Sequence, residues 1–133
     1  MDVIKIEIPS LTENIRIIES FIDNAKDRFN LNDDIYGNIM IAVTESVNNA
    51  IKHGNSGNPK KNVKLTMTLN ENTLRVEIED EGPGFDYENL PDPTAPENID
   101  KPSGRGIFLM KQLSDEVHFK NNGTLVELYF FMD

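Results

Sequence analysis

Residues 63–84 read VKLTMTLNENTLRVEIEDEGPG, and this stretch carries the strongest signal for the fold. Apolar and polar side chains alternate over 63–69 and again over 74–78, which is the period of half-buried strands. The short polar turn at 70–72 between them predicts a β-hairpin. Asp80, Gly82 and Gly84 follow the second strand directly, so the chain leaves the sheet in a turn that a flat ligand can approach closely.

The rest of the chain extends this hairpin into a sheet covered by helices. Periodicity predicts one further strand, three helices and a second hairpin, at 3–8, 11–29, 32–54, 104–113, 117–120 and 124–131. Ser10 and Glu13 fit a capping box that opens the first helix. Phe85, Phe108 and Phe119 are expected in the core rather than at a ligand. We therefore expect an α+β fold, a two-layer sandwich in which three helices cover one face of a mixed, mostly antiparallel sheet of about five strands.

Length, charge and cysteine content limit the classes of function. The 133 residues, of which 38% are hydrophobic, predict a single domain over 1–133. A formal net charge of −10 makes duplex nucleic acid and anionic membranes poor partners, although a nucleotide held locally is compatible with it. Cysteine is absent, which excludes disulfides, thiolate nucleophiles and sulfur-ligated metals. Neither a signal peptide nor an apolar membrane span is recognisable, so a cytoplasmic protein is expected.

Glu45 and Asn49 stand four residues apart in the second predicted helix. At this spacing they lie about 40° apart around the axis and roughly 6 Å apart along it, so both can reach one ligand. A carboxylate and a carboxamide placed in this way can serve as a general base and as an oxygen ligand for a divalent cation. A solvated polar helix face gives the same pattern.

Two glycine motifs flank an acidic, proline-rich segment. The first, DEGPG at 80–84, places an aspartate at a strand end, where it can accept a hydrogen bond from an amine; an ordinary turn has the same composition. The second, GRG at 104–106, opens a helix, where free backbone N–H groups favour a phosphate; a hinge is the alternative. It matches neither the dinucleotide-binding fingerprint nor the P-loop.

The order of these motifs is more specific than any one of them. Glu-x-x-x-Asn at 45–49, Asp-x-Gly-x-Gly at 80–84 and Gly-x-Gly at 104–106 resemble the N, G1 and G2 boxes of the GHKL ATP-binding superfamily. The resemblance spans about residues 35–130, and the predicted elements follow the order of the Bergerat fold. The small size and the run GRGIFLMKQLSDEV make the chain similar to the anti-sigma-factor serine kinases.

The resemblance implies ATP and Mg²⁺ as cofactors and a role for each motif. Glu45 would be the catalytic base, Asn49 would hold Mg²⁺ against the phosphates, and residues 87–103 would form a lid over the nucleotide. The other implied ATP-binding residues are Lys52 and His53 near the phosphates, Asp80, Gly82, Gly84 and Thr124 around adenine, and Ser103, Gly104, Arg105 and Gly106 at the phosphates.

Together these roles predict a serine/threonine protein kinase. It would transfer the γ-phosphate of ATP to a Ser or Thr of an antagonist (anti-anti-sigma) protein and regulate a sigma factor by partner switching, and family members often pair as homodimers. Glu45 stands where sensor histidine kinases usually carry Asn, so autophosphorylation on histidine is disfavoured. One alternative is a non-catalytic, nucleotide-gated protein-interaction module of a signalling pathway. Another is an ATPase or kinase of a phosphatase-linked pathway without a sigma factor.

Overall fold

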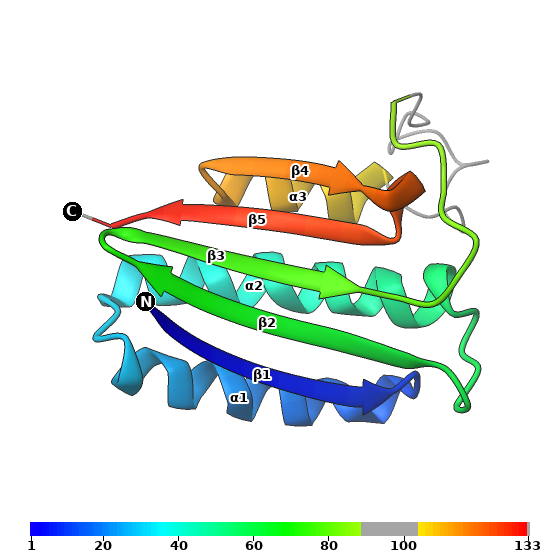
Figure 1. The fold of residues 1–133 in the computed structure, drawn as a ribbon, viewed down its shortest axis with the longest axis horizontal. Helices are drawn as coiled ribbons and strands as arrows, with labels where there is room; N and C mark the ends of the chain where they lie inside the picture. The colour runs from blue at the N-terminus through cyan, green and yellow to red at the C-terminus, as the bar shows by residue number, and fades with distance from the viewer. Residues whose placement is uncertain (89–103, 133) are drawn as a thin grey trace.

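The computed structural model describes residues 1–88 and 104–132, and its centre is a five-stranded open sheet (Figure 1). The strands are β1 (Asp2–Pro9), β2 (Asn62–Asn70), β3 (Thr73–Glu79), β4 (Glu116–Lys120) and β5 (Leu125–Phe131). Their order is β1-β2-β3-β5-β4, and all four pairings are antiparallel. The α+β class and the strand count are confirmed, whereas a mixed sheet is wrong for the described strands.

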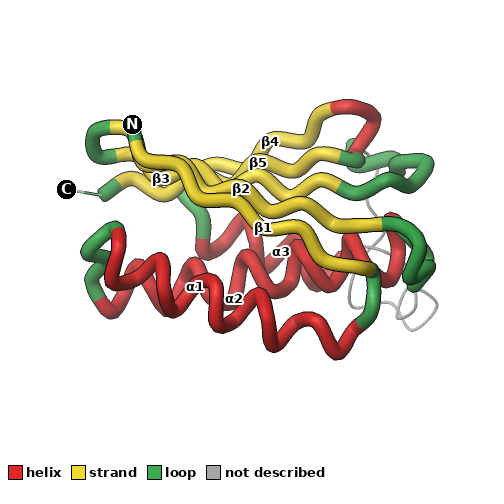
Figure 2. The backbone as a smooth tube through the Cα atoms, turned by 60° about the horizontal axis from the view of Figure 1, so that its bottom comes forward, coloured by secondary structure: helices red, strands yellow, loops and turns green. Residues whose placement is uncertain are grey.

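Within the described residues, three helices are present, and they lie on one face of this sheet, as Figure 2 shows. They are α1 (Ile15–Arg28), α2 (Asp33–Asn49) and α3 (Gly104–Leu113); a 3₁₀ turn η1 (Thr12–Asn14) precedes α1, and a π-helical turn η2 (Ala50–Gly54) continues α2. The side chain of Asn32 caps α2 by accepting a hydrogen bond from the N–H of Ile35 at 2.8 Å. No described helix has both the length and the apolar composition to cross a membrane.

The capping box predicted for the first helix is wrong. Ser10 is 1% exposed, and its hydroxyl donates to the carbonyl oxygen of Lys61 at 2.7 Å instead of capping α1. The residue before η1, Leu11, provides no side-chain cap. Ser10 therefore joins the end of β1 to the loop before β2, a contact between residues 51 positions apart that local sequence does not reveal.

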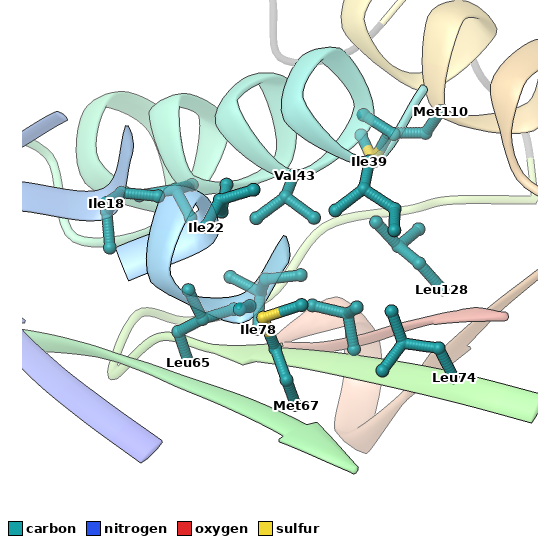
Figure 3. Packing of buried hydrophobic residues seen from close by; sticks show 14 of the residues in the cluster. Ile18, Ile22, Ile39, Val43, Leu65, Met67, Leu74, Ile78, Met110 and Leu128 are labelled. Carbon is teal, nitrogen blue, oxygen red and sulfur yellow. The ribbon is translucent and has the colours of Figure 1, made fainter. Parts of the chain in front are cut away.

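The core fills the space between the helical layer and the sheet. It is built from the apolar stripes of the helices and the inward positions of the strands, and each side chain labelled in Figure 3 is at most 1% exposed: Ile18, Ile22, Ile39, Val43, Leu65, Met67, Leu74, Ile78, Met110 and Leu128. Burying one such side chain stabilises the fold by about 1.5–3 kcal/mol. Phe108, by contrast, is 55% exposed on α3, so its predicted place in the core is wrong.

The chain topology brings the motif-bearing ends of the strands and helices to one end of the molecule. β3 ends there at Glu79 and β5 begins there, because Glu79 pairs with Leu125. The C-terminal end of α2 and the start of α3 lie at the same end in Figure 1, away from the two chain termini. The three predicted motifs are therefore brought together by the antiparallel order of the strands and by the antiparallel packing of α3 on α2.

Candidate functional site

A cleft of about 570 Å³, measured out to its open mouth, lies at this end of the molecule. Its apolar lining comes from η2, from β3 and β5 and from α3, through Ala50, Ile78, Ile107, Met110 and Val126. Among the described residues, four polar side chains reach the same cleft: Ser46, Asn49, His53 and Asp80. A mostly apolar pocket with a few convergent polar groups is the usual form of a small-molecule site.

Two aromatic residues expected only in the core also line the cleft. The rings of Phe85 and Phe119 meet edge to face, with centroids 5.6 Å apart and planes at 88°. Tyr87 stacks on Phe119 with a centroid distance of 5.1 Å. Both phenylalanines are half-buried and pack against the core, as predicted. The prediction did not include the side of each ring that lines the cleft. The position of Phe85 directly after the glycine motif is the signal that could have placed it at the site.

Asp80 presents a half-buried carboxylate to the cleft. Its Oδ1 accepts a hydrogen bond from the N–H of Gly82 at 2.8 Å, and its own N–H donates to the carbonyl oxygen of Thr124 at 2.9 Å. Burial raises the pKa of the Asp80 carboxyl above its ordinary value, and the hydrogen bond from Gly82 opposes that rise. A carboxylate that is shielded from water accepts a hydrogen bond strongly from a donor group on a ligand.

The turn after β3 touches η2 so closely that a side chain at Gly82 or Gly54 would clash. A Cβ atom at Gly82 would lie 1.8 Å from the carbonyl oxygen of Gly54, and one at Gly54 would lie 2.4 Å from Oδ2 of Asp80. The π-helical turn ends beside this contact, where the N–H of Asn55 donates to the carbonyl oxygen of Ala50 at 2.8 Å. Such turns are frequent at functional sites, and this one was not predicted.

Asn55 holds the same turn from the other side, although sequence reasoning assigned it no role. It is 1% exposed, and its Oδ1 accepts a hydrogen bond from the N–H of Glu81 at 2.7 Å. Its Nδ2 donates to Ser10 Oγ at 2.8 Å and to the carbonyl oxygen of Asn62 at 3.0 Å. The amide thus joins the Asp80 turn to β1 and β2, and no local sequence signal marks an asparagine for such a contact.

Glu45, Asn49 and the start of α3 come together as the motif spacing predicts. Asn49 lines the cleft, and Glu45 lies half-buried one turn earlier in α2. A Cβ atom at Gly106 would lie 2.9 Å from Asn49 Nδ2 and 3.3 Å from Glu45 Oε2, so the first turn of α3 packs directly on both side chains. The first backbone N–H groups of a helix lack intrahelical partners and favour anions, which makes this junction suited to a phosphate.

The remaining predicted site residues differ in their placement. His53 lines the cleft, and burial, helped by the charge of Lys52, lowers the pKa of its imidazole. Lys52 itself is exposed and is absent from the described cleft lining. The hydroxyl of Thr124 donates to the carbonyl oxygen of Asn121 at 2.8 Å, so Thr124 supports Asp80 through its backbone. Gly84 lines the cleft with a φ of +85°, a conformation that favours glycine.

Part of the prediction falls outside the described residues. This applies to Ser103, to the lid segment from residue 89 to residue 103 and to the side chain of Arg105. Gly104 is the first residue of α3.

Comparison with known proteins places the fold and the motifs in a family. The model of the histidine kinase-like ATPase domain family matches residues 8–130. The chain belongs to this family. The prediction made from the order of the three motifs is therefore confirmed at the level of the family.

Individual relatives show how far the likeness extends. The serine-protein kinase RsbW of Staphylococcus aureus, in strains JH9 and Newman, is 30% identical over 135 residues that cover 96% of this chain and 85% of the relative. The solved structure of the RsbU and RsbW domains of Rv1364c from Mycobacterium tuberculosis matches with a TM-score of 0.73 and 15% identity. That match covers 99% of this chain and 33% of the other, and at such identity it shows the fold alone.

Proposed function

We propose that this chain is an ATP-dependent serine/threonine protein kinase of the anti-sigma type, which phosphorylates an antagonist protein. The observation that carries the proposal is the placement of Asp80 and Asn49 in one apolar cleft, with the start of α3 packed against Asn49 and Glu45. Membership of an ATPase-domain family and similarity to a relative named as a serine-protein kinase support it. In this proposal the antagonist and a sigma factor are alternative partners.

Adenine would occupy the apolar part of the cleft. The carboxylate of Asp80 would accept a hydrogen bond from the exocyclic amino group, and the ring would lie among Ile78, Met110 and Phe119. Guanine carries an acceptor at the position of that amino group, so a carboxylate would repel it. Burial removes water from the Asp80 carboxylate, which raises its pKa. The same loss of water would make the contact discriminate between adenine and guanine.

The phosphates would lie at the junction of α2 and α3. Backbone N–H groups of the first turn of α3 would donate to their oxygens, and the Asn49 side chain would supply one protein oxygen to Mg²⁺. An amide oxygen in a site that also receives phosphate oxygens and water suits this ion, which keeps several waters and takes few protein ligands. A bound Mg²⁺ would offset phosphate charge in a protein whose own net charge is −10.

Glu45 would act on the attacking group. Its carboxylate lies one helical turn from Asn49 and would take the proton of the Ser or Thr hydroxyl of the antagonist. The hydroxyl oxygen would bond to the γ-phosphorus while the bond to the bridging oxygen breaks, so that phosphoserine or phosphothreonine forms and ADP leaves. The N–H groups at the start of α3 would hold the transferred group in line during this exchange.

Transfer of labelled γ-phosphate from Mg–ATP to a candidate antagonist protein tests the proposal. Replacing Glu45 by Gln should leave ADP affinity nearly unchanged and reduce transfer by about 10²–10⁴-fold, the usual contribution of a general base. Glu19→Gln, an exposed carboxylate of α1, is the matched control and should behave like the parent. Unchanged transfer in Glu45→Gln would contradict the assignment of the base. Tight ATP binding without any transfer would favour the nucleotide-gated interaction module instead.

A further inference from the structure

Ser46 carries a buried hydroxyl that the proposed mechanism leaves unused. The residue lies in α2, is 2% exposed and lines the same cleft as Asp80. Its Oγ has no hydrogen-bond partner within residues 1–88 and 104–132. A serine inside a helix commonly donates to the carbonyl one turn earlier, as the neighbouring Thr44 does to Met40 at 2.6 Å. The hydroxyl of Ser46 has no such partner among the described residues, so its hydrogen-bonding capacity is unused there.

The surroundings of Ser46 make this lack of a partner costly. The cleft is lined mainly by apolar side chains, so its walls offer few groups to satisfy a hydroxyl. Buried polar groups are almost always hydrogen-bonded, and an unsatisfied one in the lining of a cleft suits a partner that enters with a ligand. Ser46 and Asp80 together then present one donor and one acceptor to the same occupant.

We propose that Ser46 is a further adenine-binding residue that donates a hydrogen bond, directly or through one ordered water, to a ring nitrogen of the adenine beside its amino group. This inference rests on the proposed ATP site and adds a residue to it. An acceptor from Asp80 and a donor from Ser46 match a 6-aminopurine, in which an N–H donor stands beside a nitrogen acceptor. In guanine an oxygen acceptor replaces the amino group, so Asp80 would be mismatched, whereas the Ser46 hydroxyl can also accept a hydrogen bond and would contribute affinity rather than discrimination.

A cycle that deletes each partner in turn tests this contact. ADP, 1-deaza-ADP and 7-deaza-ADP, which lack one or the other ring nitrogen beside the amino group, are titrated calorimetrically into the parent chain and into Ser46→Ala. The parent should bind one of the two analogues roughly 3- to 10-fold more weakly than ADP, the range expected for one neutral hydrogen bond. Ser46→Ala should bind ADP with the same loss and should no longer distinguish that analogue from ADP.

Ser114 provides a matched control. It is also buried, at 9% exposure, and its hydroxyl also lacks a partner among the described residues, but it lies outside the described cleft lining. Ser114→Ala should therefore discriminate among the three nucleotides as the parent does. Thermal unfolding of both variants checks the fold, and Ser46→Cys, which keeps a side-chain atom at the position of the hydroxyl oxygen, repeats the cycle if Ser46→Ala is destabilised.

The outcomes separate this inference from the function on which it rests. Coupling between Ser46 and either ring nitrogen supports the inference and identifies the atom that is bound. ADP binding that is unchanged in Ser46→Ala, or equal discrimination in parent and variant, overturns the role of Ser46 and leaves the ATP site standing. A parent chain that binds none of the three nucleotides overturns both.

Discussion

Replacing Gly106 by Ala should impair phosphate transfer without unfolding the protein. The added Cβ would lie 2.9 Å from Asn49 Nδ2 and 3.3 Å from Glu45 Oε2, where ordinary contact begins at 3.4 Å. The amide must therefore move by about half an ångström, and the carboxylate by less. Displacements approaching 1 Å in a reacting geometry cost about 10²-fold in rate, so we expect transfer to fall by roughly 10- to 100-fold.

The stability of this variant should change little. Alanine favours a helix over glycine by about 0.5–1 kcal/mol, and the clash falls on the ends of two side chains that can move rather than on backbone. These effects oppose each other, so the free energy of unfolding should stay within about 1 kcal/mol of the parent. Because Asp80 and the apolar lining are untouched, ADP affinity measured in a chelator should also be retained.

Gly37→Ala is the control for this substitution. Gly37 lies inside α2, and a Cβ atom there would meet nothing within 4 Å. This variant should gain about 0.5–1 kcal/mol in urea unfolding and transfer phosphate at the parental rate. Parental transfer by Gly106→Ala would refute the reasoning, since it would mean that the contact of α3 with Asn49 and Glu45 does not position the reacting groups.

Three further predictions concern single side chains. Asn49→Ala should weaken ATP binding more in Mg²⁺ than in chelator by calorimetry, and equal loss in both conditions would make Asn49 structural. The parent should lose thermal stability relative to His53→Gln as the pH falls below 6.5, because burial holds the pKa of His53 below that value in the folded state; parallel pH profiles would contradict this. Asp80→Asn should raise the free energy of unfolding of the nucleotide-free protein at neutral pH, because burial raises the pKa of Asp80 and penalises the ionised form. This gain should shrink as the pH falls towards 3.8 in urea unfolding, and a gain independent of pH would point to another cause.

Much of the fold could be predicted because its elements are encoded by local periodicity. Alternation located the five strands to within about two residues, and α3 occupies the predicted residues 104–113. Asn32 caps α2 with its own side chain, through a hydrogen bond to a residue only three positions away, which local sequence can reveal. The capping role of Ser10 failed because its partner, Lys61, lies 51 residues away. Contacts of that range are set by tertiary packing, which a single sequence does not display.

The residues of the candidate site also fall into those that local motifs predict and those that only tertiary contacts reveal. Glu45, Asn49, Asp80 and Gly106 belong to motifs with fixed spacing, and the structure brings all four to one end of the molecule. Asn55, Gly54 and Ser46 were missed as site residues, because their roles arise only when η2 meets the turn after β3 and when α2 meets the cleft. An asparagine in a polar loop and a serine in a helix have no sequence pattern of their own.

Titration calorimetry of the chain with ATP in Mg²⁺, run in parallel on the parent and on Asp80→Asn, tests the central claim most directly. If the cleft is an adenine site, the parent binds ATP at one site and GTP much more weakly. Asp80→Asn then loses a charge-assisted hydrogen bond of about 1.5–3 kcal/mol, which is roughly one to two decades of affinity. ATP affinity that is equal in the variant and the parent, or no ATP binding by the parent, would contradict the account.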